Sequence, residues 1–274
     1  MPARVSASRP GEAVELDATP RTVVLVGDAA PEVGRRARAL AETAGLPLLA
    51  EPSSNARGGS SAIAGYRELL GGELGAAIER VICFGHPTLS RPVTRLLRRD
   101  DLEIVVVSAE ADLVAPGQRV SAFVDEVELA RVDLGRGDET WLARWLEADL
   151  ARPVAATPES DAALTPADLA AQVWQACAGQ QLVIGSSASI RHLDVAPITA
   201  HPPVVWANRG LSGIDGTLHT AFGIAASTQA PVTANPGHCA TAWSSSVRAS
   251  APKLRGIDGH ATLRWSTRCS RPSL

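Results

Sequence analysis

Short apolar runs alternate with amphipathic stretches over the first half of the chain. The run TVVLVGD, residues 22–28, is rich in β-branched residues and predicts a strand buried on both faces. Residues 30–45 carry alanine and other apolar residues at helical spacing and predict a helix that stops at the terminal glycine. The same alternation returns in strands predicted at residues 80–85 and 103–109. Because alternating strands and helices build a parallel sheet covered on both faces, we expect one α/β domain over residues 21–150.

A break in this pattern separates the second half of the chain. Residues 151–163 are rich in Pro, Ala and acids without a period and predict a linker. Residues 165–168 (TPAD) combine an N-cap threonine, a proline suited to the first helical position and an acid that completes a capping box. The runs QLVIG, residues 181–185, and PVVWA, residues 203–207, then predict two strands, and a helix of small residues follows the second.

Composition favours an ordinary soluble protein of one or two domains, and two are expected. The chain has 274 residues, of which 45% are hydrophobic and 20% charged. No apolar run is long enough for a membrane span, and residues 1–20 form an irregular segment without the apolar core of a signal peptide, so a cytoplasmic protein is predicted. The four cysteines include no C-x-x-C pair and suit reduced thiols.

The C-terminal segment, residues 228–274, differs in charge from the rest. It carries six basic residues and one acid, a net charge of +5; the whole chain carries -3, so the first 227 residues carry -8. The segment lacks hydrophobic periodicity and is interpreted as an aberrant, disordered basic tail. Nucleic-acid binding is the alternative that such a charge raises. Zinc binding by its histidines and cysteines is disfavoured, since their spacing matches no standard site.

Two predicted turns carry the candidate chemistry. The first, residues 185–187 (GSS), ends a strand and begins a short helix, where exposed N–H groups and hydroxyls suit an anion. The second contains Arg209, whose guanidinium fork suits a carboxylate or a phosphate. Three glycines around it allow close approach of a ligand: Gly210, Gly213 and Gly216. Alternatively the glycines serve only helix packing, and Arg209 pairs with Asp215. Because ligands bind at the carboxyl edge of parallel sheets, the two turns together favour a site for an anionic ligand.

Three motifs resemble one enzyme family. GSSASIRHLD (residues 185–194) is followed by NRGLSGIDGTLHTAFGIA (residues 208–225), and FGHPTLSRPVTRLL (residues 84–97) lies upstream. Together they closely resemble the thiamine-diphosphate-dependent 2-succinyl-5-enolpyruvyl-6-hydroxy-3-cyclohexene-1-carboxylate synthases of menaquinone biosynthesis (MenD type). The resemblance covers residues 21–227. It implies a Rossmann-like central domain over residues 21–150, followed by the first part of a diphosphate-binding α/β domain over residues 164–227.

The resemblance also implies the chemistry. Family members are homo-oligomers that decarboxylate 2-oxoglutarate on thiamine diphosphate with Mg²⁺ or Mn²⁺, and add the succinyl-semialdehyde unit to isochorismate. Arginine suits these substrates because it binds carboxylates through paired, charge-assisted hydrogen bonds. The residues implied to face the substrates are Arg91, Ser187, Arg191 and Arg209. Those implied to bind the cofactor are Gly185, Ser186, Ser187, Gly213, Ile214, Asp215 and Gly216.

The sequence departs from the family pattern in several places. No activating glutamate can be assigned, and the Gly-Asp strand of the metal motif, expected soon after Ala226, is absent. Gly27-Asp28 with Asn55 imitates that motif, but it lies in the central-domain portion and is rejected. Ser90 stands where relatives carry a basic residue. The chain alone is therefore predicted to be a catalytically silent fragment. The alternative is a non-catalytic Rossmann-like module for small-molecule binding or protein interaction.

Overall fold

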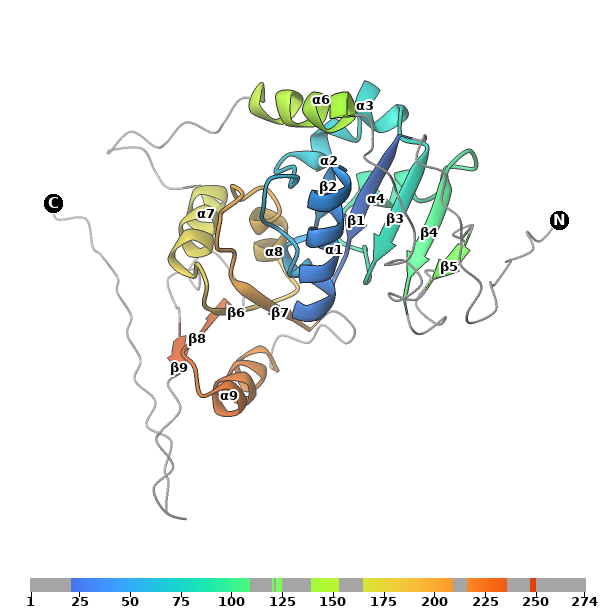
Figure 1. Cartoon of the computed structure of the whole chain (residues 1–274). Coiled ribbons are helices and arrows are strands. Elements are labelled where there is room, and N and C mark those ends of the chain that lie inside the picture. The colour runs from blue at the N-terminus through green and yellow to red at the C-terminus, as the bar shows by residue number, and fades with distance from the viewer. Residues whose placement is uncertain are drawn as a thin grey trace, which may run out of the picture. The chain divides into compact units, whose positions relative to one another are not determined.

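The structure of the protein is a computed structural model (Figure 1). In it the chain divides into two compact units. One unit comprises residues 1–156 with 197–200, and the other comprises residues 157–196 with 201–274. The described residues are 21–108, 120, 122–124, 139–152, 165–208, 216–235 and 247–249. The predicted N-terminal segment and most of the predicted linker lie outside them. None of the helices in these ranges has the length and apolar character needed to cross a membrane.

A five-stranded parallel sheet forms the centre of the first unit. Its strands are β1 (Thr22–Val26), β2 (Leu48–Ala50), β3 (Arg80–Phe84), β4 (Glu103–Val107) and β5 (Ala122–Val124). They lie in the order β2-β1-β3-β4-β5. The strand that follows β1 in sequence lies on one side of it and the later strands lie on the other, so the strand order reverses between β1 and β3. The three longest strands match the β-branched runs in the sequence. The predicted α/β class with a parallel sheet is confirmed.

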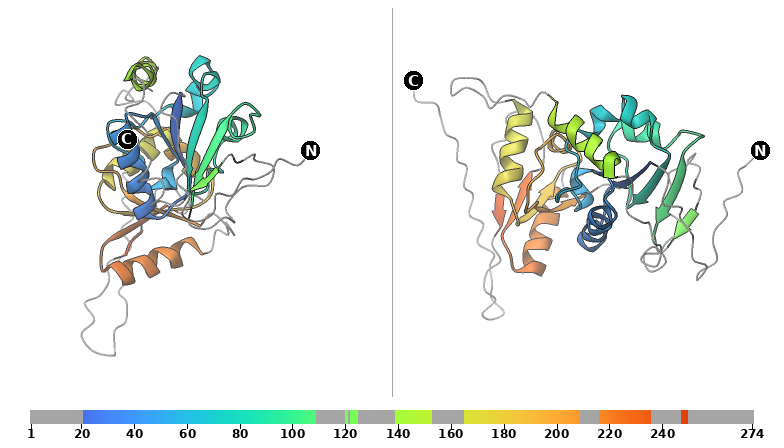
Figure 2. Two further views of the ribbon diagram at one scale, coloured as in Figure 1. Left: turned by 45° about the vertical axis from the view of Figure 1, so that its right-hand side comes forward. Right: turned by 45° about the horizontal axis from the view of Figure 1, so that its top comes forward.

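Helices cover both faces of this sheet (Figures 1 and 2). They are α1 (Pro31–Ala44), α2 (Tyr66–Leu69), α3 (Glu73–Ala76), α4 (Arg91–Leu96) and α6 (Glu139–Leu150), with a 3-10 turn, η1, at Pro52–Ser54. α1 begins with its proline and, as predicted, ends at Gly45, which adopts the left-handed conformation at a φ of 66°.

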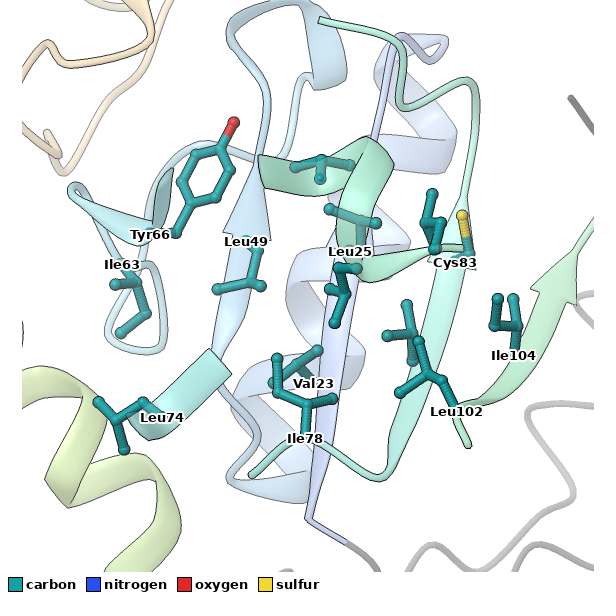
Figure 3. Packing of buried hydrophobic residues seen from close by; sticks show 14 of the residues in the cluster. Val23, Leu25, Leu49, Ile63, Tyr66, Leu74, Ile78, Cys83, Leu102 and Ile104 are labelled. Carbon is teal, nitrogen blue, oxygen red and sulfur yellow. The ribbon is translucent and has the colours of Figure 1, made fainter. Parts of the chain in front are cut away.

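Alternation along β1 divides the core into two clusters. Val24 and Val26 point to the face covered by α1, whose Ala37 and Ala41 are fully buried there. Val23 and Leu25 point to the opposite face, where they pack with residues of α2, α3, α4 and α6 (Figure 3). Because both faces are covered, β1, β3 and β4 are apolar after their first residue, which is the pattern expected of a buried parallel sheet.

The second unit has a smaller sheet. Its elements are α7 (Pro166–Ala176), β6 (Gln181–Ile184), α8 (Ala188–Leu193), β7 (Val204–Ala207), α9 (Thr217–Thr228), β8 (Val232–Asn235) and β9 (Val247–Ala249). The order is β7-β6-β8-β9, and only β9 is antiparallel. The predicted capping box is present at the start of α7, where Thr165 and Asp168 each accept a hydrogen bond from the other's backbone N–H. On one face α9 packs Ala221 and Ala225 against β6 and β8.

The C-terminal segment corrects one prediction. Regular structure was expected to end at residue 227, but α9 runs to Thr228 and β8 follows at Val232–Asn235. β8 pairs with β6 along its whole length, so the sheet has a third parallel strand in addition to the two predicted. The four residues of β8 are too few to show a period. The strand is stabilised by pairing and by burial of all four residues, including the β-branched Val232 and Thr233.

Candidate functional site

The first candidate turn follows β6 directly. Ser187 is the N-cap of α8; its hydroxyl accepts a hydrogen bond from the Ser189 N–H at 3.4 Å and lies 2.9 Å from the Ser189 hydroxyl. The Ser187 N–H donates to the Gly185 carbonyl at 2.8 Å. Arg191 lies in the last turn of α8 and is exposed. The turn therefore places small polar groups at the carboxyl edge of the sheet, with a cation one helical turn away.

A chain of hydrogen bonds joins this turn to the second one. The Ser186 hydroxyl donates to the Asn208 carbonyl, just after β7, at 2.7 Å. The Asn208 side-chain amide donates to the Thr220 hydroxyl on α9 at 3.1 Å. A Cβ on Gly216, the N-cap of α9, would lie 3.9 Å from the same amide nitrogen. The two ends of the second turn thus come together beside Ser186, at the carboxyl edge of β6 and β7.

The centre of the second turn lies outside the described residues. This applies to Arg209, Gly210, Gly213, Ile214 and Asp215, whose implied roles stay predictions. Of the residues that the resemblance implies, the structure gathers Gly185, Ser186 and Ser187 at one edge with the flanking Gly216. Sequence reasoning assigned no role to Asn208, although it begins the quoted motif. Its bonds to Ser186 and Thr220 were not visible in the sequence.

β8 brings a third strand end to this edge. The Gly185 N–H donates to the carbonyl of Asn235 at 2.8 Å, and Asn235 is only 7% exposed. The three neighbouring parallel strands β7, β6 and β8 therefore all end within hydrogen-bonding reach of the turn at residues 185–187. The sequence signal for this residue was weak, because Asn235 falls in the segment that was interpreted as a disordered tail.

Arg91 belongs to the first unit. It is the first residue of α4 and is exposed, while the neighbouring Ser90 is buried as the N-cap and accepts a hydrogen bond from the Val93 N–H at 3.5 Å. The Ser90 side chain therefore caps this helix.

The loop between β3 and α4 is held close to the sheet. Asp28 and His86 exchange two backbone hydrogen bonds of 3.1 and 3.0 Å. A Cβ on Gly27 would lie 2.0 Å from backbone atoms of His86 and Pro87, so only glycine fits beneath the loop. The Glu51 carboxylate, fully buried at the end of β2, accepts the Leu89 N–H at 2.9 Å. These contacts close the point between β1 and β3 where open α/β sheets commonly bind ligands.

Comparison with known proteins identifies the family. The chain is 48% identical over 227 residues to the 2-succinyl-5-enolpyruvyl-6-hydroxy-3-cyclohexene-1-carboxylate synthase of Kineococcus radiotolerans, an alignment that covers 78% of this chain and 40% of the relative. The synthases of the same name from Nocardioides sp. and Arthrobacter sp. are 46% and 45% identical over 75% of this chain. Over about three quarters of its length the chain is therefore similar to members of this synthase family. It spans about 40% of the length of the first two relatives. No protein-family model matches the chain.

The synthase family depends on thiamine diphosphate, and the resemblance adds a divalent metal. β8 ends at Asn235, a neutral amide. Within the part of the chain that the structure describes, no three His, Cys, Asp or Glu side chains gather as metal ligands.

The turn after β6 has limited capacity for a diphosphate. Its N–H groups at Gly185 and Ser187 already donate to Asn235 and to Gly185. The Ser186 hydroxyl proton is donated to Asn208. In this arrangement an anion at the edge would be bound mainly by guanidinium groups, which is consistent with arginines close to the motif in sequence.

Proposed function

We propose that this chain carries part of the active site of a thiamine-diphosphate-dependent synthase that decarboxylates 2-oxoglutarate and adds the product to isochorismate. The observation that supports the proposal best is the meeting of three strand ends, at Gly185, Asn208 and Asn235, beside the helix that carries Arg191. Parallel sheets bind ligands at this edge, and the family motifs of the sequence lie there.

In this proposal the polar groups have distinct roles. Ser187 and Arg191 bind a substrate carboxylate, and Arg209 binds a second anionic group from the following turn. Arg91, in the first unit, binds a substrate carboxylate. The backbone of residues 213–216 lines the thiamine diphosphate. Charge-assisted hydrogen bonds to carboxylates would hold the reactants in the geometry of attack.

The isolated chain is proposed to be catalytically silent. Among the described residues no three His, Cys, Asp or Glu side chains gather. A diphosphate without its cation would face only dipoles and arginines, so its affinity should be poor. Addition of 2-oxoglutarate, thiamine diphosphate and Mg²⁺ to the purified chain should therefore release no carbon dioxide above background. Measurable cofactor-dependent release would contradict the silence.

Binding of the substrate anion gives the direct test. Titration with 2-oxoglutarate, followed by NMR of the arginine side-chain N–H groups, should shift the resonance of Arg191, and Arg191→Ala should weaken binding about 10-fold or more, as loss of a charged hydrogen bond does. Arg35→Ala is the matched control, since Arg35 lies on α1 in the first unit and pairs with Glu32. Equal affinity in both variants would contradict the proposed site. Tight binding of a nucleotide with no response to 2-oxoglutarate would favour the alternative of a non-catalytic binding module.

A further inference from the structure

The buried carboxylate of Glu51 is the most unusual charge in the first unit. The residue has no exposed surface, and its backbone N–H donates to the Val26 carbonyl at the end of β1. From the end of β2 its side chain extends past β1 to the loop after β3, where it accepts the Leu89 N–H. Burying a carboxylate is costly unless hydrogen bonds compensate it, so packing alone would be served better by an apolar residue.

The loop that Glu51 contacts leads directly to Arg91. Three of its positions are held: His86 by the paired bonds with Asp28, Leu89 by Glu51, and Ser90 by its capping bond to Val93. Of these anchors only Glu51 is a carboxylate, and charge-assisted bonds are shorter and about twice as strong as neutral ones. The charge of Glu51, after burial itself, also helps to raise the pKa of the Cys83 thiol on β3, to about 12.

We propose that Glu51 is a positioning residue that fixes the loop of residues 86–90 and thereby the place from which Arg91 meets a carboxylate. The role of Arg91 itself rests on the proposed function. The inference adds a second residue, remote from the ligand, on which the geometry of Arg91 depends.

The test compares Glu51→Ala with Glu51→Gln in the 274-residue chain. In the alanine variant, hydrogen exchange at the Leu89 amide should rise about 10- to 100-fold, the equivalent of losing a bond to a charged group. The backbone order parameter of Arg91 should fall from about 0.85 towards 0.6. Glutamine keeps an acceptor oxygen in the same place, so it should restore much of the protection at Leu89. It also serves as the folded variant if alanine prevents folding.

Asp149 supplies the matched control. Its carboxylate accepts the N–H groups of Ala64 and Gly65 at 2.8 and 2.7 Å, in a different loop of the same unit. Asp149→Ala should release those two amides and leave Leu89 and Arg91 unchanged. If Glu51→Ala leaves the exchange of Leu89 or the order of Arg91 unchanged, the positioning role is overturned.

A ligand titration separates this inference from the proposed function. The Arg91 side-chain resonance should respond to 2-oxoglutarate or isochorismate in the wild type, and about 10-fold more weakly in Glu51→Ala, a change equal to about 1.4 kcal/mol. A wild type without any response would contradict the proposed role of Arg91. The exchange and order measurements would still decide whether Glu51 positions the loop.

Discussion

The two sheets end differently at their carboxyl edges. In the first unit the edge is closed by backbone: the loop after β3 lies on Gly27, pairs with Asp28 and is held by a buried glutamate. In the second unit the edge is joined by small polar side chains, with Ser186 donating to the end of β7 and Asn208 to α9. The same parallel architecture therefore supports a closed edge in one unit and a polar edge in the other.

This contrast separates two tasks of a sheet edge: holding the start of a helix in place and binding a ligand. A closed edge leaves little room for a ligand at the sheet itself, but it holds a helix start, here α4 with Arg91, in a defined place. A polar edge instead uses its hydroxyl and amide groups to join the strand ends to one another, and leaves the binding of an anionic ligand mainly to nearby arginines. The residues that the resemblance implies as functional are divided between the two units in the same way: Arg91 alone in the first, and serines, glycines and arginines in the second.

Truncation of a core tryptophan should have the largest effect and test whether the units unfold separately. Trp145 has no exposed surface and packs edge-to-face on Trp141, with ring centroids 5.7 Å apart. Trp145→Ala should destabilise the first unit by about 3–5 kcal/mol in urea denaturation. Trp145→Phe should cost much less, because the indole N–H has no partner among the described residues. Hydrogen exchange in β6 should stay unchanged; equal loss in both units would contradict separate folding.

A methyl group added beneath the closed edge should have the next largest effect. Gly27→Ala would overlap the backbone of His86 and Pro87 and should cost about 2–3 kcal/mol, as overpacking does. Gly223→Ala, inside α9, meets nothing within 4 Å and should stabilise the second unit by about 0.8–1 kcal/mol through helix propensity. Urea midpoints moving in opposite directions would support the contrast, whereas a harmless Gly27→Ala would show that the edge is not closed.

Removal of the Ser186 hydroxyl should show how much one side-chain hydrogen bond at the polar edge contributes to stability. Ser186→Ala removes the bond to the Asn208 carbonyl and should cost about 1 kcal/mol. Ser227→Ala, which removes a bond to Ile224 on the surface of α9, should change stability by less than about 0.5 kcal/mol. Amide exchange at the end of β7 should rise in the first variant only. Identical exchange in the two variants would mean that Ser186 does not hold the strand ends together.

Acid should produce the smallest and most local effect. Thr165 holds the pKa of Asp168 below its ordinary value of 3.8, through its hydroxyl and then its backbone N–H. A carboxyl group whose pKa is lower in the folded chain than in the unfolded chain stabilises the fold at pH values above the unfolded-state pKa. This stability is lost as the pH falls through the lower folded-state pKa. The first turn of α7 should therefore loosen only below pH 3.8, as amide exchange would show. In Asp168→Asn this pH dependence should disappear, and a persisting acid transition there would assign it to another group.

Much of the architecture was predictable because its signals are local. β1, β3 and β4 are runs of β-branched residues, and the caps of α1 and α7 rest on a glycine, prolines and a Thr/Asp pair close in sequence. β8 was missed because its four residues, flanked by prolines, are stabilised by pairing with a strand some 50 positions earlier.

The candidate site was predictable only where residues act through their own motif. The serines after β6 and the exposed start of α4 could be found in the sequence. Glu51 could not, since an acid after a short apolar run looks like an ordinary turn residue until the fold buries it against Leu89. Asn208 likewise gains its place from partners on two other elements.

The antiparallel strand β9 has a consequence for assembly. It pairs with β8 on the side away from β6, through residues 232–234 and 247–249. One border of a strand accepts a single neighbour, because each backbone donor and acceptor on that side is already used. Any additional strand approaching β8, from this polypeptide or from another, would therefore first have to displace Val247–Ala249.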